Sequence, residues 1–463
     1  MKRVVVIGGG FAGLHLIRYL AGRIRADEAE VTLIDRNNFH LFTPLLYQVA
    51  TGELPPHAVA YPLRVPLARH GFRFVRAEVA GIDLAGRVVH TSEGEFPYDH
   101  VVVAPGSVTN DFGIAGVKEH ALVVKWLTDG RALRHRILSV FEEAGSEPDA
   151  AKRKELLSFV IVGAGPVGVE LSASMRDLMD HTLRPIYPTI DMRREPSITL
   201  IDGADRVVPQ MDPRLSEISL RRLRQLGTDV RLRTLAAEVT ADGLRTKDGL
   251  FIKAHTVIWA GGVRSNPLLA ALDLPKAKDG RIVVDQFFRA GGRDDVLALG
   301  DAAAFDYHGA PLPMLAQVAV LQAPAAAKNI AHLVRREPLE PYRYKRKGDL
   351  VALGRTSAAA EFEWPGHLVL SGILAWTVWR TNYLMQLVGT RSRATQSSGR
   401  RPAGDPRRHR HTRQPDGSPQ SHAGRRSQSP SGGRVRVLAG DRRAAAAGRG
   451  SGYVMSATIR RAK

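Results

Sequence analysis

The sequence contains no cysteine among its 463 residues. Disulfide bonds, thiolate metal sites and Cys-x-x-Cys redox chemistry are therefore excluded for this chain, and we expect no metal. Long apolar runs are also scarce, because the most hydrophobic stretch, residues 368–389, is interrupted by Arg380. A helix needs about 20 apolar residues to cross a bilayer, so this stretch is expected to lie on a membrane rather than span it. A buried C-terminal helix is the alternative.

Acidic residues are scarce in one part of the chain only. Residues 391–463 carry 18 basic and three acidic residues, a net charge of +15, whereas the rest of the chain carries only +5. Arg, Ser, Gly, Pro and Gln dominate this segment, which predicts a basic disordered tail. One hypothesis for the tail is out-of-frame translation of a GC-rich gene. Nucleic-acid binding through the tail would be a different class of function, but the tail lacks interleaved aromatic residues, so no nucleic acid is expected.

A glycine motif follows the first apolar run of the chain. The β-branched run Val4–Ile7 predicts a strand that is buried on both faces, and residues 14–20 predict a helix. Gly8, Gly10 and Gly13 stand between them as Gly-x-Gly-x-x-Gly. In that pattern the first glycine permits a tight turn, the second lets a pyrophosphate approach the backbone, and the third lets helix and strand pack closely. The spacing predicts a dinucleotide site.

An acidic residue supports this interpretation. Asp35 ends the next strand, Val31–Asp35, and lies 22 residues after Gly13. A carboxylate at about this distance takes the hydroxyls of the adenosine ribose. The alternative is a glycine-rich turn in an unrelated α/β domain, which would not require an acid there.

A second copy of the motif occurs in the middle of the chain. Gly163, Gly165 and Gly168 follow a strand predicted over residues 158–162, and Asp202 ends the strand after that. The chain begins directly with a strand, so no signal or transit peptide is expected. Two such units indicate two nucleotides bound at once, as in a flavoprotein that accepts hydride from a nicotinamide cofactor.

The segments between these units are less distinctive. Residues 38–52 form an apolar loop that is expected to wall a cofactor or substrate cavity, with His40 as a packing residue. Residues 74–82 and 87–91 predict a small antiparallel unit, and residues 152–155 a charged link.

Three further segments follow the second copy. The strand at 295–301 ends in Asp301, which is either a flavin contact or a helix cap. Residues 314–330 predict a helix that Pro324 should kink. Residues 342–363 read as a short β-segment.

Taken in order, these motifs resemble those of the type II NADH:quinone oxidoreductases, also called alternative NADH dehydrogenases. The resemblance extends over about residues 1–390. It rests on Gly8–Gly13, His40–Ala50, Val162–Glu170, Ile258–Arg264, Gly300–Ala303 and Ala316–Ala319.

The resemblance implies a respiratory flavoprotein that passes hydride from NADH to non-covalent FAD and then two electrons to membrane quinone, without pumping protons. It implies a peripheral, monotopic enzyme on the cytoplasmic side of the cell membrane, and a homodimer is left open. The expected FAD contacts are Gly8, Gly10, Phe11, Ala12, Gly13, Asp35, Arg36, Gly106, Asp301, Ala316 and Gln317. The expected NADH contacts are Gly163, Gly165, Pro166, Val167, Gly168, Glu170, Asp202 and Gly262, with Glu170 and Gln317 as catalytic residues.

The expected fold is α/β, with two Rossmann-like dinucleotide-binding domains of the FAD/NAD(P)-linked reductase type and a C-terminal membrane-associating segment. The expected ranges are 1–120 with 290–340 for FAD, 121–289 for NADH, 341–390 for the membrane segment and 391–463 for the tail. Asp202 is expected to select NADH over NADPH.

Several alternatives stay open at this point. From the residues alone, Glu170 is equally well a first-turn acid that interacts favourably with a helix dipole. The family usually has glutamine at the position of Leu321, whose loss removes a polar contact from the expected quinone pocket, and Pro324 should interrupt the helix that carries Gln317. Sulfide:quinone oxidoreductases use redox cysteines, which are missing here, whereas a soluble FAD-dependent NAD(P)H:ferredoxin or rubredoxin reductase needs the same two nucleotide sites.

Overall fold

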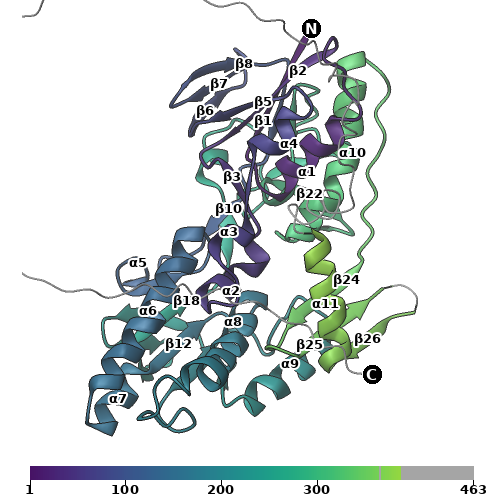
Figure 1. Ribbon diagram of the computed structural model, residues 1–463. Helices are drawn as coiled ribbons and strands as arrows, with labels where there is room; N and C mark the ends of the chain where they lie inside the picture. Colours follow the sequence, from purple (N-terminus) through teal and green to yellow (C-terminus); the bar gives the residue numbers. More distant parts are fainter. Residues whose placement is uncertain (364–365, 387–463) are drawn as a thin grey trace, which may run out of the picture. The chain divides into compact units, whose positions relative to one another are not determined.

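Two parallel sheets, each with helices packed on it, organise the described part of the chain (Figure 1). The computed structural model describes residues 1–363 and 366–386, which lie within one compact unit, Met1–Arg400. The predicted tail, 391–463, and the end of the predicted membrane segment, 387–390, lie outside the described residues.

The first sheet is built around β1, Lys2–Ile7, whose Val4 and Val6 are fully buried. Its order is β21-β9-β1-β2-β5, all parallel. The other strands are β21 Val296–Ala298, β9 His100–Val103, β2 Ala29–Asp35 and β5 Arg73–Arg76. Because β-branched side chains suit a strand covered on both faces, this Val/Ile run forms the centre of the sheet.

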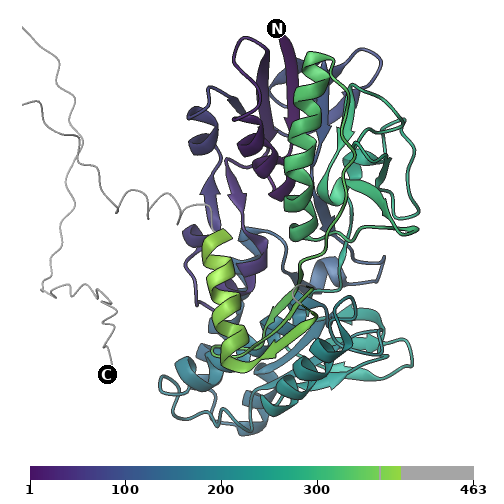
Figure 2. The ribbon, with the colours of Figure 1, turned by 90° about the vertical axis from the view of Figure 1, so that its right-hand side faces the viewer.

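Two helices that are far apart in the sequence lie side by side on the first sheet (Figures 1 and 2). They are α1, Phe11–Leu20, and α10, Ala316–Arg335. The predicted interruption at Pro324 is wrong, because α10 runs through it without a break. Buried alanines on either side of this position, Ala323 and Ala326, hold α10 in the first core.

The predicted antiparallel unit is partly wrong. Phe74 belongs to β5 of the parallel sheet, and the antiparallel sheet starts only at Val79. The chain leaves β5 after Arg76, so two strands in different sheets follow each other where the sequence suggested one. The antiparallel strands are β6 Val79–Asp83, β7 Val88–Thr91 and β8 Gly94–Pro97.

The second sheet repeats the design of the first, with the order β11-β18-β12-β13-β14, all parallel. Its strands are β11 Ala121–Val123, β18 Thr256–Trp259, β12 Ser158–Val162, β13 Ser197–Ile201 and β14 Asp229–Arg231. The longer helices of this half are α6 Leu127–Ser146, α7 Ala150–Leu156, α8 Pro166–Asp177 and α9 Pro213–Gln225. The charged link predicted at 152–155 is wrong, because these residues lie inside α7. Asp149 caps that helix by accepting from the Ala151 N–H at 2.8 Å.

Smaller elements complete the two halves. The short strands are β3 Phe39–Leu41, β4 Ala60–Pro62, β10 Ser107–Thr109, β15 Ala236–Thr240, β16 Gly243–Thr246, β17 Phe251–Lys253, β19 Val263–Ser265, β20 Ile282–Val284, β22 Ala303–Tyr307 and β23 Ala310–Pro311. The short helices are α2 Leu46–Ala50, α3 Pro56–Val59, α4 Arg64–Ala68 and α5 Val117–His120, with helical turns at Thr43–Leu45, Leu178–Leu183, Pro267–Leu269 and Gly300–Ala302. The pairing of β10 with β19 links the two halves.

The C-terminal part returns across the second half. Its three antiparallel strands are β24 Gly348–Ala352, β25 Ala358–Phe362 and β26 Leu368–Ser371. The helix α11, Gly372–Gln386, follows and packs Ala375 and Trp379 into the second core (Figure 2). The predicted short β-segment is thus a hairpin, and the predicted apolar stretch 368–389 divides into a strand and a helix.

The hydrophobic cores do not follow the predicted domain ranges throughout. Leu269, Leu272, Ile282 and Phe288 pack in the core of the first half, although the sequence analysis assigns residues 121–289 to the NADH-binding domain. The assignment of each half to a nucleotide stays a prediction.

Candidate functional site

One cavity of about 1210 Å³ connects the features that the sequence analysis identified. Both glycine turns line it, and so do the loop after β2, the N-terminal end of α10, the hairpin β24–β25 and α11. A cavity of this size, lined by apolar walls with a few polar groups, is typical of a ligand or cofactor site.

The first glycine turn has a shape that only glycine allows. Gly8 has a φ of +99°, and a Cβ there would collide with the carbonyl oxygen of Ala104, which directly follows the neighbouring strand β9. A Cβ on Gly13 would collide with the carbonyl oxygen of Gly8, so α1 packs directly against the turn. Gly10, by contrast, faces open space at the start of α1. This leaves room for a pyrophosphate at the helix N-terminus.

The second glycine turn repeats this geometry. Gly163 has a φ of +105°, and a Cβ on it would collide with the carbonyl oxygen of Ala260. A Cβ on Gly168 would collide with the carbonyl oxygen of Gly163, and Gly165 again faces open space. The chain therefore has two equivalent places where a helix N-terminus can receive a phosphate group.

An aspartate closes each turn. Asp35 accepts from the Gly9 N–H at 2.6 Å and from the Asn37 N–H at 2.6 Å. Asp202 accepts from the Ala164 N–H at 2.6 Å, with Ala204 donating to its other oxygen. Burial raises the pKa of Asp35, while the backbone donors and Arg36 oppose that rise. Both carboxylates line the cavity and keep free lone pairs for ribose hydroxyls.

A short chain of polar side chains runs along the cavity at the end of β21. Lys125 Nζ donates to Ser107 Oγ at 2.9 Å, and Ser107 donates to Asp301 Oδ2 at 2.6 Å. Burial lowers the pKa of Lys125, and the charge of Asp301 opposes this. Asp301 is thus the end of a three-residue chain, not an isolated helix cap.

Trp126 and Arg36 form a second pair on the cavity wall. The Arg36 guanidinium lies 4.3 Å from the centre of the Trp126 ring, close enough for a cation–π contact. Asp129 accepts from the backbone N–H groups of Lys125 and Trp126, which fixes both residues at the start of α6.

Glu170 lies in the first turns of α8 and is only 5% exposed. One of its oxygens accepts from the backbone N–H of Ala352 on β24 at 3.0 Å. Burial raises the pKa of Glu170 to about 8, with a smaller contribution from Glu53, and the bond from Ala352 opposes the rise. A cavity carboxyl that stays protonated at neutral pH can donate a proton.

Gln317 lies at the start of α10 and points its amide toward β24. Its Nε2 donates to the carbonyl oxygen of Gly348 at 3.2 Å. Leu321, the position where the family usually has glutamine, lies one turn further along α10 and also lines the cavity. The wall at this turn is therefore apolar.

The apolar loop after β2 forms part of the wall, as expected. Tyr47 lines the cavity, and Phe42 contacts Phe11 and Tyr383 with ring centres 5.4 and 5.7 Å apart. His40 is buried with Nδ1 3.1 Å from the Gly9 oxygen, and burial lowers the pKa of its ring to about 4. It packs behind the turn and is neutral at ordinary pH.

The structure brings the predicted site residues together. Every residue predicted to contact FAD or NADH lines the cavity except Gly13 and Gly168, which pack behind their turns. Lys125, Ser107 and Trp126 are cavity residues that sequence reasoning missed, since nothing in their local pattern marks them. Among the described residues, no group of three His, Asp or Glu side chains could hold a metal ion.

The observed cradle fits a flavin dinucleotide and a nicotinamide dinucleotide. There is open space at Gly10 and Gly165, where a pyrophosphate could approach, and each turn has its own carboxylate beside it, Asp35 or Asp202.

Comparison with known proteins agrees with this geometry. The family model described as pyridine nucleotide-disulphide oxidoreductase matches residues 2–323. The chain is 34% identical over 413 residues to the type II NADH:quinone oxidoreductase Ndh of Mycobacterium tuberculosis, covering 85% of this chain and 86% of that protein. It is 32% identical over 384 residues to the type II NADH:quinone oxidoreductase of Haemophilus influenzae, covering 77% of this chain and 86% of that protein.

A solved structure of NDH2 from Plasmodium falciparum in complex with NADH has the same fold. The TM-score is 0.74 at 19% identity, covering 84% of this chain and 95% of that chain.

Proposed function

The chain belongs to the pyridine nucleotide-disulphide oxidoreductases and, within them, to the type II NADH:quinone oxidoreductases, and from this premise we propose how its cavity oxidises NADH and reduces quinone. The enzyme is a flavoprotein NADH dehydrogenase that uses FAD and transfers electrons to quinone without pumping protons. The observation that carries the proposal is one continuous cavity, which is lined by both glycine turns and extends to Gln317.

The residues of the first turn would hold FAD. The α1 N-terminus at Gly10 would receive its pyrophosphate, Asp35 would bind the adenosine ribose, and Asp301 would contact the flavin part of the molecule. Lys125 and Ser107 fix the orientation of Asp301. Bound FAD would accept hydride from NADH and pass two electrons on to quinone.

NADH occupies the second turn. The α8 N-terminus at Gly165 receives its pyrophosphate, and Asp202 takes the ribose hydroxyls and repels a 2′-phosphate. Glu170, which accepts from Ala352 on β24, lines the same cavity, and its protonated carboxyl would serve there as a proton donor beside the bound nicotinamide.

Quinone enters on the side of α10 and α11. Gln317 offers its amide there, and Leu321 and Tyr383 give an apolar wall that suits a ring with an isoprenoid tail. The Gln317 amide is already held by Gly348, so its oxygen is free to face the cavity.

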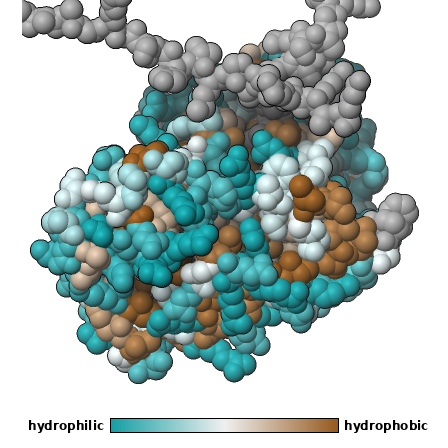
Figure 3. All heavy atoms as spheres, turned by 60° about the horizontal axis from the view of Figure 1, so that its bottom comes forward, coloured by the Kyte–Doolittle hydropathy of each residue, from teal (hydrophilic) through white to brown (hydrophobic). Residues whose placement is uncertain are grey.

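The proposed contact with the membrane is made by α11, near the end of the described chain. Ile373 and Leu374 on α11 are 63% and 68% exposed, and Met385 is 62% exposed. Within residues 1–363 and 366–386, no helix has both the length and the apolar character needed to cross a membrane. Brown apolar patches interrupt the hydrophilic surface on the face shown in Figure 3. We propose a peripheral enzyme with the exposed apolar residues of α11 against the lipid, and the family resemblance implies the cytoplasmic side of the membrane.

The test is the absorption spectrum of the purified protein before and after anaerobic NADH, followed by addition of quinone. The expected result is a yellow protein that NADH bleaches and quinone restores. Correctly folded, colourless protein that FAD cannot reconstitute would overturn the proposal. Bleaching without restoration by a short-chain quinone in detergent would favour a ferredoxin-type reductase instead.

A further inference from the structure

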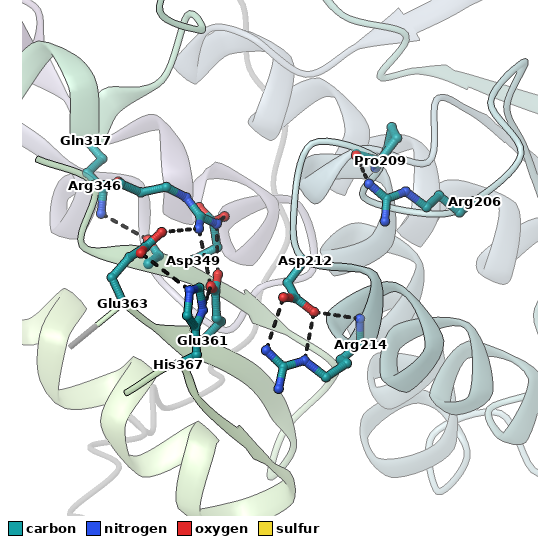
Figure 4. A network of polar contacts seen from close by, with 11 residues as sticks. Arg206, Pro209, Asp212, Arg214, Gln317, Arg346, Asp349, Glu361, Glu363 and His367 are labelled. Carbon is teal, nitrogen blue, oxygen red and sulfur yellow. Dashed lines mark hydrogen bonds and ion pairs between the residues drawn. The ribbon is translucent and has the colours of Figure 1, made fainter. Parts of the chain in front are cut away.

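A cluster of charged side chains lies beside Gln317 (Figure 4). Arg346 stands at its centre and pairs with three carboxylates, on Asp349, Glu361 and Glu363. His367 lies against the outer side of the same group (Figure 4). None of these residues was marked by the sequence motifs.

The cluster has an inner side that faces the cavity. Asp349 and Glu361 both line the cavity, and Gly348, the residue before Asp349, accepts the hydrogen bond from Gln317 at 3.2 Å. The Glu361 side chain is fully buried at 0% exposure. Its two oxygens accept from Arg346 at 2.8 and 3.2 Å.

The cluster also has an outer side. His367 is 60% exposed, and Glu363 is 31% exposed. The Nδ1 atom of His367 lies 3.3 Å from Glu361 Oε1, and its Nε2 atom lies 3.8 Å from Glu363 Oε2. One imidazole ring therefore bridges a buried carboxylate at the cavity and a partly exposed carboxylate at the surface.

The strand pairing places two acidic side chains of the cluster opposite each other. Asp349 and Glu361 stand directly opposite each other in the antiparallel pairing of β24 and β25. Like charges in that position destabilise a sheet. Burial and the charges of Glu361 and Glu363 raise the pKa of Asp349, and Arg346 opposes that rise. The cluster holds three carboxylates against one guanidinium, so it has capacity to take up a proton.

Charged and titratable groups from neighbouring elements complete the surroundings. At the N-terminus of α9, Asp212 lies near His367 and Arg214 lies near Glu361 (Figure 4). Tyr344, before β24, and Tyr383, on α11, lie near Asp349. Asp212 and Arg214 are paired with each other at 3.0 Å, so they add little net charge.

The reaction has a proton requirement that this cluster can meet. NADH supplies two electrons and one proton as hydride, whereas quinone takes up two electrons and two protons to become quinol. The balance NADH + H⁺ + quinone → NAD⁺ + quinol therefore draws one proton from solvent in each turnover. A buried quinone site needs a route for that proton.

We propose that Glu361 and His367 form this route, carrying a solvent proton into the quinone side of the cavity. The inference rests on the proposed quinone reduction. A proton enters His367 at Nε2, assisted by Glu363, and the Nδ1 proton passes to Glu361 Oε1 and on to the cavity. Arg346 is a positioning residue that holds the carboxylates, and His367 resets by exchange with water because it is exposed.

The experiment compares two half-reactions in full-length enzyme with FAD bound. Stopped-flow measures flavin reduction by NADH and flavin reoxidation by a short-chain quinone, in Glu361→Gln and His367→Gln. The matched control is His90→Gln, which removes an exposed histidine that lies 3.2 Å from Glu95 on the sheet of β6 to β8. FAD content, melting temperature and NADH:ferricyanide activity report on folding and on the first half-reaction.

Removing a proton donor costs about 10²–10⁴-fold when no other donor replaces it. We expect quinone reoxidation to slow at least about tenfold in Glu361→Gln, with flavin reduction unchanged. In His367→Gln we expect a smaller loss that free imidazole restores, because imidazole can replace the missing ring. His90→Gln should match the wild type in both steps.

The outcomes separate the two proposals. A wild type that reduces flavin but never passes electrons to quinone overturns the proposed function. A wild type that reduces quinone, together with unchanged reoxidation in Glu361→Gln, overturns the proton route. If Glu361→Gln fails to bind FAD, the reoxidation rate of His367→Gln tests the route instead, because His367 is exposed. A His367→Gln loss without imidazole rescue, or no loss at all, overturns the route.

Discussion

Replacing Glu170 by glutamine gives the sharpest test of the cavity chemistry. The amide has the same shape and still accepts the hydrogen bond from Ala352, so the contact with β24 is kept. It cannot donate a proton to a substrate as an acid. We therefore expect quinone reoxidation of the flavin to slow more than its reduction by NADH.

The buried environment of Glu170 also predicts the pH dependence. With a pKa of about 8, the carboxyl is about nine-tenths protonated at pH 7 and about one-tenth protonated at pH 9. If the protonated form is the donor, the reoxidation rate should fall about tenfold per pH unit above pH 8. In Glu170→Gln, the reoxidation rate should no longer fall above pH 8. Stopped-flow measurements from pH 6 to 10 give the reoxidation rates of the wild type and of the variant.

The same pKa has a consequence for stability. The pKa of Glu170 is raised in the folded state from 4.5 to about 8, so its contribution to stability is fully present below pH 4.5 and is lost as pH rises through 8. The difference corresponds to about 5 kcal/mol as an upper bound. The melting temperature of Glu170→Gln should therefore exceed that of the wild type by an amount that grows from about pH 5 to pH 8 and levels off above about pH 8.

Two results would refute this reasoning. If the alkaline limb persists in Glu170→Gln, another group controls the profile. If only flavin reduction slows, Glu170 positions the nicotinamide and does not act as the acid.

Three further predictions concern the cofactors and the membrane. Gly13→Ala should lower both FAD content and melting temperature, because its Cβ meets the Gly8 carbonyl, whereas Gly10→Ala should weaken FAD binding with the melting temperature of the apoprotein unchanged. Asp202→Ala should reduce the NADH-over-NADPH ratio of kcat/KM by roughly tenfold, the range of a lost charged hydrogen bond, and an unchanged ratio would contradict the role of Asp202. Replacing the exposed Ile373 and Leu374 by glutamate should abolish co-sedimentation with liposomes at all salt concentrations while ferricyanide reduction persists, and retained binding would place the lipid contact elsewhere.

The glycine turns could be predicted from sequence because their constraints are local. Gly8 needs a positive φ and Gly13 needs to approach the Gly8 carbonyl, and both needs arise within one strand-to-helix turn, so the spacing identifies the motif. Asp35 was found for the same reason, since it ends the next strand in the chain. These positions line or support the cavity as expected.

Features that depend on distant pairings could not be predicted. Glu361 enters the cavity only because β25 pairs with β24 and Arg346 bridges the two strands. Lys125 becomes a site residue through Ser107, a residue of the first half of the molecule. The helix α7 was missed because it has no buried residue, so it carries no amphipathic pattern to detect.

The strand β24 connects the two ends of the proposed chemistry. Its first residue, Gly348, accepts from Gln317, and its last residue, Ala352, donates to Glu170. These contacts are four residues apart, about 13 Å along a strand. Both contacts use backbone groups of the strand, so a slip of one residue would place the groups of other residues opposite Gln317 and Glu170. A Cβ on Gly348 would collide with the carbonyl oxygen of Glu361, which holds that register at the cavity end. The hairpin thus fixes the position of Glu170, the proposed acid beside the nicotinamide, relative to Gln317, the proposed amide contact of quinone. Its second strand, β25, carries Glu361 of the proposed proton route.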